Sequence, residues 1–306
     1  MATKSLWVES YRPATLDGYV FKDERQQQQI QSWIEQKSIP HLLFSGGAGV
    51  GKTTLAKILF NELEIDDLDI LEINASRERG IDAMRDRITN FIQMIPFGEF
   101  KVVLLDEADF LTPPAQASLR GIMEEYSDTS RFVLTCNYPN KIIPAIHSRC
   151  QGFHIEKVDS VEFTARVATI LMEEHIEFDL DTLDTYVKAT YPDLRKCINT
   201  VQMNSISGTL NIATSGDTGL ADYRLAMVEL FKAGKIDEAR KLLCSQARPE
   251  EMEEIFRWLY DNIELFGNDE KQKKAILIIK QGLVDHTLMS DSEINLSATL
   301  IRLGNL

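Results

Sequence analysis

Short apolar runs alternate with amphipathic stretches along the first half of the chain. The runs are too short for helices and are rich in Val, Leu, Ile and Phe, which is typical of strands buried on both faces of a parallel sheet. They lie at residues 41–44, 70–73, 101–105, 131–136 and 153–155. Helical stretches separate them, so the pattern predicts an α/β domain in which helices flank a parallel sheet.

The stretch at residues 81–95 has the spacing of a helix with one buried face. Its apolar residues recur every three or four positions, at Ile81, Met84, Ile88, Ile92 and Ile95. We therefore expect all five side chains to lie on the buried face of this helix.

From about Lys157 onward the pattern becomes entirely helical. Helical segments are expected at residues 161–175, 181–190 and 192–203, and Ser, Gly, Thr, Asn and Asp interrupt the periodicity at 205–220. About five amphipathic helices follow this linker, without any metal-binding, nucleophilic or phosphate-binding motif. A helical packing or assembly domain is the simplest interpretation of this region.

Composition restricts the function classes further. The 306 residues are enough for two or three domains, and the net charge of −14 argues against a surface coated for non-specific nucleic-acid binding. Any contact with DNA therefore requires a local basic patch. The four cysteines form no C-x-x-C pair, which argues against a zinc module or a disulfide framework. No apolar run is long enough for a signal core or a membrane span, so we expect a cytoplasmic protein.

The clearest chemical motif follows the first apolar run. Gly46, Gly51, Lys52 and Thr53 fit the G-x-x-x-x-G-K-[ST] phosphate loop, with a strand before it and a helix after it. Glycines allow the backbone N–H groups to point at phosphate oxygens, and the helix N-terminus adds partial positive charge. Lys52 can reach the β and γ phosphates of a nucleotide, and the Thr53 hydroxyl can bind Mg²⁺.

Acidic and amide side chains end the next apolar strands. Asp106 and Glu107 end the run at 101–105, at the strand end where open α/β sheets bind their ligands. Asp106 is then placed to hold Mg²⁺, and Glu107 to activate a water molecule as general base. Asn137 ends the run at 131–136 and can contact that water or the γ phosphate.

Arginines in an acidic chain are the candidates for phosphate contacts outside the loop. Arg77, Arg79 and Arg85 lie around a predicted helix start, where they suit DNA phosphates, although the local pattern slightly favours salt bridges with neighbouring acids. Arg149 precedes the last strand and is either a surface residue or an arginine finger for a neighbouring subunit. The segment before the phosphate loop, residues 1–40, either wraps an adenine ring or simply packs against the domain.

In this order and spacing, the motifs resemble the small ATPase subunits of replication factor C-type sliding-clamp loaders, within the AAA+ superfamily. The matching segments are Trp7-Val-Glu, Tyr-Arg-Pro13, Pro40-His-Leu-Leu-Phe44, Gly49-Val-Gly-Lys-Thr-Thr54, Glu72-Ile-Asn-Ala-Ser76, Arg79-Gly-Ile-Asp82, Leu105-Asp-Glu-Ala-Asp109, Ala115-Gln-Ala-Ser-Leu-Arg120, Cys136-Asn-Tyr138, Ser148-Arg-Cys150 and Pro192-Asp-Leu-Arg195. The likeness is dense over residues 6–204 and architectural beyond. The length and short tail are also similar to the large subunit of T4-type phage clamp loaders, and a phage-encoded chain would work in the cytoplasm of a bacterial host.

This resemblance implies three domains. Residues 1–155 form an α/β P-loop AAA+ ATPase core, 156–207 a small helical lid and 221–306 an all-α collar that holds a five-subunit ring, with 208–220 as a linker. Implied partners are the other loader subunits, the sliding clamp and primer–template DNA, and no membrane. The implied activity is DNA-stimulated hydrolysis of ATP with Mg²⁺.

The resemblance also implies residue roles. Arg149 acts in trans on the ATP of the next subunit, whereas Arg195 contacts the γ phosphate of its own nucleotide. The helix near Arg79 faces DNA, and the loop at 94–99 lies towards the clamp. The implied nucleotide contacts are Glu9, Ser10, Tyr11, Val20, Gly49, Val50, Gly51, Lys52, Thr53, Thr54 and Arg195.

Several positions depart from the family pattern. Ser10 stands where lysine is usual, Gly47-Ala48 replaces a double proline, Arg77 replaces an aspartate and Gly121 replaces a second arginine. Two other functions remain open: another AAA+ switch, such as a helicase loader or recombination motor, and a ring subunit that binds nucleotide without hydrolysing it. The full set of catalytic residues argues against the second.

Overall fold

The computed structural model describes residues 6–19, 21, 24–77, 81–212 and 223–306, and describes 81–83 and 250 by their backbone alone. The described chain forms two compact units. The first comprises residues up to 166 together with 192–199, and the second comprises 167–191 with 200–306. The predicted division into core, lid, linker and collar stays a prediction, and residues 213–220 of the linker lie outside the described part.

A parallel five-stranded sheet forms the centre of the first unit. Its strands are β1 (Leu42–Ser45), β2 (Ile70–Asn74), β3 (Lys101–Asp106), β4 (Ser130–Cys136) and β5 (Gln151–His154). They lie in the order β2-β3-β4-β1-β5, and every neighbouring pair is parallel. The α/β fold with a parallel sheet is therefore confirmed.

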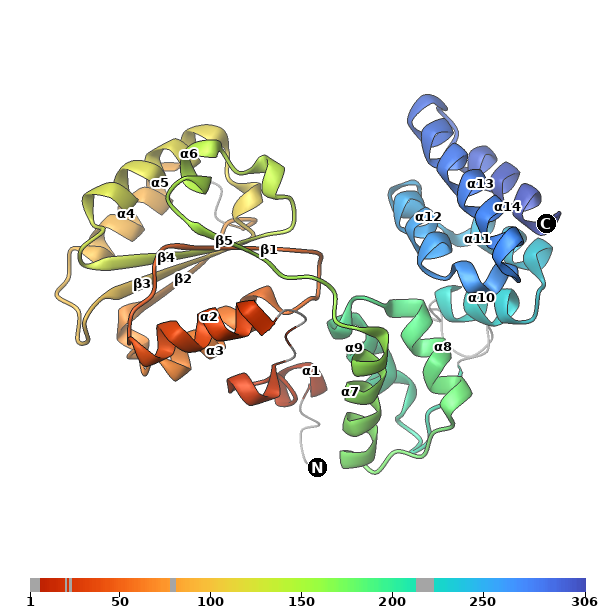
Figure 1. Ribbon diagram of the computed structural model, residues 1–306, viewed down its shortest axis with the longest axis horizontal. Coiled ribbons are helices and arrows are strands. Elements are labelled where there is room, and N and C mark those ends of the chain that lie inside the picture. Colours follow the sequence, from red (N-terminus) through yellow and green to blue (C-terminus); the bar gives the residue numbers. More distant parts are fainter. Residues whose placement is uncertain (1–5, 20, 22–23, 78–80, 213–222) are drawn as a thin grey trace. The chain divides into compact units, whose positions relative to one another are not determined.

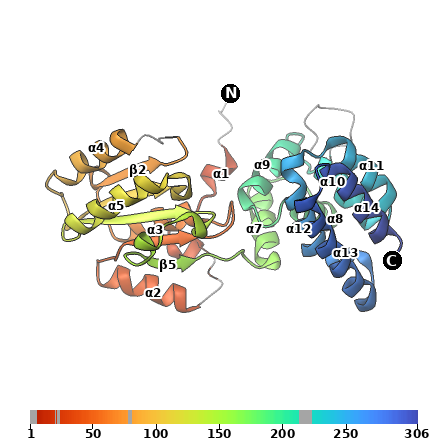
Figure 2. The same cartoon turned by 90° about the horizontal axis from the view of Figure 1, so that it is seen from above.

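Helices cover both faces of this sheet, because its strands are apolar on both sides. The unit contains α1 (Trp7–Ser10), α2 (Glu24–Glu35), α3 (Lys52–Glu62), α4 (Ile81–Ile92), α5 (Pro113–Glu125) and α6 (Pro144–His147), with the short 3-10 helices η1 (Leu16–Gly18), η2 (Asp67–Asp69), η3 (Ala108–Phe110) and η4 (Pro139–Lys141). Figure 1 shows α4, α5 and α6 on one face and α2 and α3 on the other. In Figure 2, α4 lies near the β2 edge and α2 near the β5 edge.

Alternate strand residues enter two separate hydrophobic cores. Val103 and Leu105 of β3 pack with α4, α5 and α6, whereas Val102 and Leu104 pack with α2 and α3. This two-residue period is the expected consequence of side chains alternating across a strand. It leaves the strand ends, rather than the faces, open to ligands.

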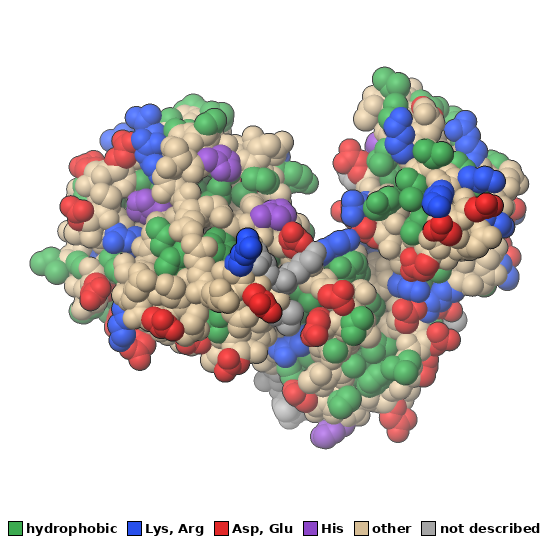
Figure 3. All heavy atoms as spheres, in the orientation of Figure 1, with side chains coloured by type: hydrophobic (Ala, Val, Ile, Leu, Met, Phe, Trp, Pro, Cys, Tyr) green, Lys and Arg blue, Asp and Glu red, His purple; other side chains and the backbone are tan. Residues whose placement is uncertain are grey.

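The prediction for Ile95 is wrong. Met84, Ile88 and Ile92 are buried, but α4 ends at Ile92 and the side chain of Ile95 is 89% exposed. Pro96 supplies the reason, because a residue before proline is disfavoured in the helical conformation. The loop of residues 93–100 therefore leaves the helix, and Figure 3 shows hydrophobic side chains protruding over it at the left edge of the molecule.

The second unit is helical. Helices α7 (Ser160–Glu173) and α9 (Leu194–Asn204) each have residues in both units, and the second unit also contains α8 (Leu180–Thr190), α10 (Tyr223–Lys232), α11 (Ile236–Gln246), α12 (Met252–Asp261), α13 (Asp269–Leu288) and α14 (Ser292–Gly304), with η5 (Pro249–Glu251) and η6 (Ile263–Phe266). The five α-helices after residue 222 match the predicted number. None of the described helices is long and apolar enough to cross a membrane.

Aromatic and polar contacts connect α8 to the C-terminal helices. Phe231 packs against Trp258 with ring centroids 5.2 Å apart, and Trp258 Nε1 donates to the Lys188 carbonyl at 2.6 Å. The Lys232 ammonium lies 2.7 Å from the Asp184 carboxylate. Helix α8 therefore belongs to the same packed unit as α10 and α12.

Candidate functional site

The phosphate loop joins the end of β1 to the start of α3. Gly49 and Gly51 have φ angles of 72° and 95°, a region that favours glycine. A Cβ on Gly49 would lie 2.1 Å from Asp193 Oδ1 and 3.0 Å from the Asp193 Cα. A Cβ on Gly51 would lie 3.1 Å from the ring of Tyr19. Both backbone angle and close packing therefore require glycine in this loop.

Lys52 is the first residue of α3, and it points back into the loop. Its Nζ donates to the Gly46 carbonyl at 3.0 Å, the Gly47 carbonyl at 2.6 Å and Asn137 Oδ1 at 2.8 Å. The residue is only 8% exposed. Burial lowers the pKa of Lys52, and nearby Asp106 opposes that shift. The contacts hold an ammonium group at the centre of the loop, where it can meet an anionic phosphate.

A hydroxyl–carboxylate cluster lies at the end of β3. Asp106 Oδ1 accepts hydrogen bonds from Thr53 Oγ1 at 2.8 Å and from Thr135 Oγ1 at 2.5 Å. Thr135 Oγ1 also accepts from the Glu107 backbone N–H at 3.0 Å. These are hard oxygen donors of the kind that Mg²⁺ prefers. The structure thus brings together both residues that the sequence predicted as metal ligands.

Glu107 has a strained backbone for a residue other than glycine. Its φ and ψ angles are 57° and 42°, in the left-handed region. Such a conformation costs roughly 1–3 kcal/mol and is concentrated at functional sites. The turn ends β3 abruptly and leaves the Glu107 side chain in the lining of the cavity beside Lys52 and Thr53.

The turn that carries Asn137 is held by a buried acid, Asp109. The backbone N–H groups of Asn137 and Tyr138 donate to the Asp109 carboxylate at 3.4 Å and 3.2 Å, and Asp109 is 6% exposed. The Asn137 side chain accepts from Lys52, as described above. Asp109 therefore fixes the turn after β4, and that turn brings the amide to the phosphate loop.

All predicted catalytic residues except Arg149 meet in one small cavity of about 100 Å³. The cavity is lined by Ala48, Gly49, Gly51, Lys52, Thr53, Thr54, Asp106, Glu107, Thr135, Cys136, Asn137 and Arg195. Arg195 comes from α9 and lies close enough to Lys52 to contribute to lowering its pKa. The lining combines cationic side chains, hydroxyl groups and carboxylates, a composition suited to a polyphosphate with a cation.

A second, more apolar cavity of about 130 Å³ adjoins the first and shares Gly49, Gly51, Thr54 and Arg195 with it. Tyr11, Val50, Tyr19, Phe163 and Arg166 also line it. Arg166 donates to the Tyr11 carbonyl at 2.9 Å and so connects the N-terminal segment to α7. An apolar chamber next to a phosphate pocket has the composition expected for a flat heteroaromatic base.

The structure separates the predicted N-terminal contacts. Tyr11 lines the apolar cavity, but Glu9 and Ser10 are not among its lining residues. Glu9 instead forms an ion pair with Arg12 at 2.9 Å. Val20 lies outside the described residues.

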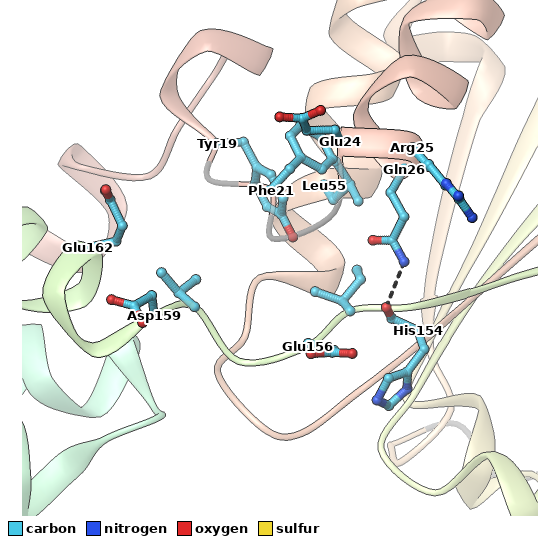
Figure 4. A pocket seen from close by; sticks show the side chains of 12 residues that line it. Tyr19, Phe21, Glu24, Arg25, Gln26, Leu55, His154, Glu156, Asp159 and Glu162 are labelled. Carbon is cyan, nitrogen blue, oxygen red and sulfur yellow. Dashed lines mark hydrogen bonds between the residues drawn. The ribbon is translucent and has the colours of Figure 1, made fainter.

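A larger cavity of about 760 Å³ also has Tyr19 in its lining (Figure 4). Acidic residues dominate its charged lining, with Glu24, Glu156, Asp159 and Glu162 against Arg25 and His154. Gln26 Nε2 donates to the His154 carbonyl at 3.0 Å across it. Its carboxylates would repel phosphate groups, so size alone does not make it the nucleotide site.

Arg149 does not line the phosphate cavity. Its guanidinium donates to the Ala145 carbonyl at 2.6 Å and the Ser148 hydroxyl at 3.2 Å, and forms an ion pair with Glu124 of α5. Arg149 thus lies beside α6 and α5, outside the cavity that Lys52 lines.

The predicted DNA-contact arginines are surface residues where they are described. Arg77 follows β2 and Arg85 lies on α4, and both are exposed. Neither forms an ion pair within the described part of the chain, whereas Arg79 lies outside it. Their side chains are therefore accessible to an anionic partner.

Sequence reasoning missed three residues of the site. Thr135 contacts Asp106, Tyr19 covers Gly51, and Arg166 holds Tyr11. Only Thr135 left a signal, as a polar residue near the end of an otherwise apolar strand. Tyr19 and Arg166 come from segments whose approach to the loop no local pattern encodes.

Comparison with known proteins agrees with this site. Residues 42–157 match the family described as "ATPase family associated with various cellular activities (AAA)". The replication factor C small subunit of Methanococcus vannielii is 37% identical over 97% of this chain and 98% of that protein. That of Sulfolobus acidocaldarius is 37% identical over 99% and 97%. That of Haloarcula marismortui reaches 44% over 67% of this chain and 64% of its own length.

Solved structures share the fold at much lower sequence identity. The RuvB Holliday junction branch migration motor of Thermotoga maritima is 18% identical, with a TM-score of 0.55 over 81% of this chain and 80% of that chain. Its T158V variant has a TM-score of 0.56 over the same shares. At this level of identity, these similarities show the fold of the chain and nothing about its partners.

Proposed function

The chain belongs to the family of replication factor C small subunits, which are AAA+ ATPases, and from this premise we propose that it hydrolyses ATP to load a sliding clamp onto primer–template DNA. The main support for the proposal is the arrangement of the phosphate site. The phosphate-loop residues Lys52 and Thr53 lie within one cavity with Asp106 and Glu107, which are the parts that ATP hydrolysis needs. Other loader subunits, the clamp and DNA are its partners.

The nucleotide is ATP, bound across both cavities. The triphosphate lies against the loop and Lys52, and the adenine enters the apolar chamber beside Tyr11 and Tyr19. Thr53 and Asp106 would hold Mg²⁺, since their oxygens already share a hydrogen bond at 2.8 Å. When bound, the ion neutralises charge on the β and γ phosphates.

Glu107 is the proposed general base. Its carboxylate accepts a proton from water as that water attacks the γ phosphorus, while the bond to the β–γ bridging oxygen breaks and ADP leaves with the electron pair. Asn137 orients the water or the γ phosphate. Lys52 stabilises the charge that develops on the phosphate oxygens, and Arg195 reaches the same phosphate from α9. Because the donors are already held in place, little reorganisation is needed at the moment of reaction.

Arg149 is the proposed finger for a neighbouring subunit. Its absence from the lining of the phosphate cavity supports a role in trans, because it leaves the chain's own site without this cation. Arg77, Arg79 and Arg85 remain the candidates for DNA phosphates. An exposed arginine contributes to DNA affinity mainly by releasing counterions, so these contacts are expected to be salt-dependent.

Two exposed apolar surfaces suit the protein partners. Met94, Ile95 and Phe97 of the loop at 93–100 are each more than half exposed, and we propose that they dock on the clamp. Helices α13 and α14 also expose large apolar side chains, which suit a collar between subunits. These are Ile276, Leu277, Leu283, Val284, Leu288, Ile294 and Ile301. The proposed compartment is the cytoplasm that contains the replicating DNA.

A recombination motor or helicase loader is not favoured as the function. The likeness to RuvB is confined to the fold, whereas the replication factor C relatives match almost the whole chain at twice the identity. A non-hydrolysing ring subunit would not need Glu107, the proposed general base, at the edge of the phosphate cavity.

Steady-state ATP hydrolysis tests the proposed function. The purified chain is assayed alone and with its partner subunits, with and without primer–template DNA and clamp. We expect strong stimulation only when partners, DNA and clamp are all present, because the finger comes from a neighbour. Robust activity of the lone chain that is indifferent to DNA would favour another AAA+ switch instead.

Lys52→Met tests the phosphate contact. Methionine fills a similar volume but has no charge, so the nucleotide loses a charge-assisted hydrogen bond of about 1.5–3 kcal/mol. We expect ATP affinity to fall about 10- to 100-fold, measured by titration with a fluorescent ATP analogue. Lys57→Met is the control, and it should leave the affinity unchanged, because the half-exposed Lys57 pairs with Glu72 and lines neither cavity.

A further inference from the structure

A buried ion pair lies at the amino-terminal ends of β2 and β3, whereas the nucleotide site lies at the carboxyl ends of the strands. Asp69 immediately precedes β2 and Lys101 begins β3, and their side chains are 0% and 3% exposed. Lys101 Nζ lies 2.8 Å from Asp69 Oδ1 and sits over the ring of Phe91 at 4.4 Å from its centroid. Neither residue contributes to the ATP site, since both lie at the opposite ends of strands that finish at Asn74 and Asp106.

The other oxygen of Asp69 binds the loop that follows α4. Asp69 Oδ2 accepts the backbone N–H of Phe97 at 2.7 Å and that of Gly98 at 2.8 Å. Burial alone would raise the pKa of Asp69, but the hydrogen bonds from Lys101 and Gly98 outweigh it, so the pKa lies below its ordinary value. The carboxylate is therefore ionised at neutral pH and holds the loop with charge-assisted bonds.

The held loop exposes three large apolar side chains. Met94 is 58%, Ile95 89% and Phe97 74% exposed, and the pinned backbone N–H belongs to Phe97 itself. Burying a charged pair is costly, and replacing it by apolar residues is often neutral or favourable for stability. Here the buried pair holds a solvent-facing loop in one conformation. This indicates that the conformation of the loop is required for function.

We propose that Asp69, supported by Lys101, is a positioning residue that pre-organises the loop at 93–100 for docking onto the sliding clamp. The inference rests on the proposed function. It assigns to Asp69, which lies beneath the loop, an effect on the affinity of the loader for the clamp. A rigid loop loses less conformational entropy when its side chains become immobilised in a partner's apolar pocket. Asp69 thus acts on clamp binding through Phe97 and not by contact with the clamp.

Clamp binding by the assembled loader tests this inference. A fluorescently labelled cognate sliding clamp is titrated with loader in a slowly hydrolysed ATP analogue, and the dissociation constant is measured by anisotropy. Asp69→Asn removes the charge that faces three donors, and we expect about ten-fold weaker binding. Asp67→Asn is the matched control, since it makes the same change two residues away at an exposed site.

A double-mutant cycle separates positioning from general destabilisation. Phe97→Ala is expected to weaken clamp binding, and adding Asp69→Asn should then cost much less than it does in the wild type, because both act through one contact. ATP turnover with DNA but without clamp should stay unchanged in every variant. Losses that simply multiply would overturn the positioning role.

A second variant covers the case in which Asp69→Asn does not assemble, because it leaves Lys101 buried without a partner. The double variant Asp69→Leu/Lys101→Met removes both charges together. It also removes the carboxylate that accepts the backbone N–H groups of Phe97 and Gly98, so the same loss of clamp affinity is expected. Normal affinity in a folded variant would refute the inference alone. A wild-type loader that does not bind the clamp at all would refute the proposed function with it.

Discussion

Glu107→Gln is expected to preserve ATP binding and to lower hydrolysis by about 10²- to 10⁴-fold, the usual contribution of a general base. Glutamine has the same shape and keeps the backbone N–H that donates to Thr135 Oγ1 at 3.0 Å. It cannot accept a proton from the attacking water at neutral pH. The measurement is single-turnover hydrolysis by the assembled loader with DNA and clamp, together with ATP affinity by titration.

The control for this change is Glu125→Gln, an exposed glutamate near the end of α5. It makes the same chemical substitution outside the cavity, and its turnover should match the wild type. If Glu107→Gln also hydrolyses ATP at the wild-type rate, Glu107 is not the base. Loss of ATP affinity instead of turnover would assign Glu107 to binding.

Arg149→Ala is expected to lower DNA- and clamp-stimulated hydrolysis in the assembled ring by about 10³-fold or more, the effect of removing an arginine finger. ATP affinity of the lone chain should not change, because Arg149 does not line its own phosphate cavity. Arg149→Lys should restore little activity, since lysine lacks the planar fork of donors.

Rings assembled from two different variants test directly whether Arg149 acts on a neighbouring subunit. A loader in which this chain carries Lys52→Met still contains Arg149, whereas one with Arg149→Ala still contains Lys52. Mixing the two kinds of subunit should recover part of the activity, because intact sites then meet intact fingers at some interfaces. No recovery, or normal stimulation of the Arg149→Ala ring, would contradict a finger that acts on a neighbour.

The strands and the phosphate site could be predicted because their determinants are local. Each buried strand is a largely apolar run; Asp106 and Asn137 follow such runs directly, and Lys52 and Thr53 follow the glycine loop after the first run. Parallel strands bring their carboxyl ends to one edge, so residues distant in sequence meet there without further information. The structure places these four side chains around one cavity, as that argument requires.

The remaining features depend on packing that no single segment encodes. Ile95 has helical spacing, but the following proline ends the helix and turns this side chain to solvent. Tyr19 reaches Gly51 from a segment with no periodicity. The Asp69–Lys101 pair joins two residues that look like ordinary surface charges in sequence, and only the parallel register of β2 and β3 buries them together.

The strand β3 also bears on how this protein can evolve. It has Lys101 at one end and Asp106 at the other, with Val102 and Leu104 facing one core and Val103 and Leu105 facing the other. Inserting or deleting one residue would turn every later side chain to the opposite face. Homologues can therefore exchange one apolar side chain for another along β3. A change in its length would move Lys101, which pairs with Asp69, out of register with Asp106 at the other end. Insertions and deletions should therefore be confined to the loops on either side.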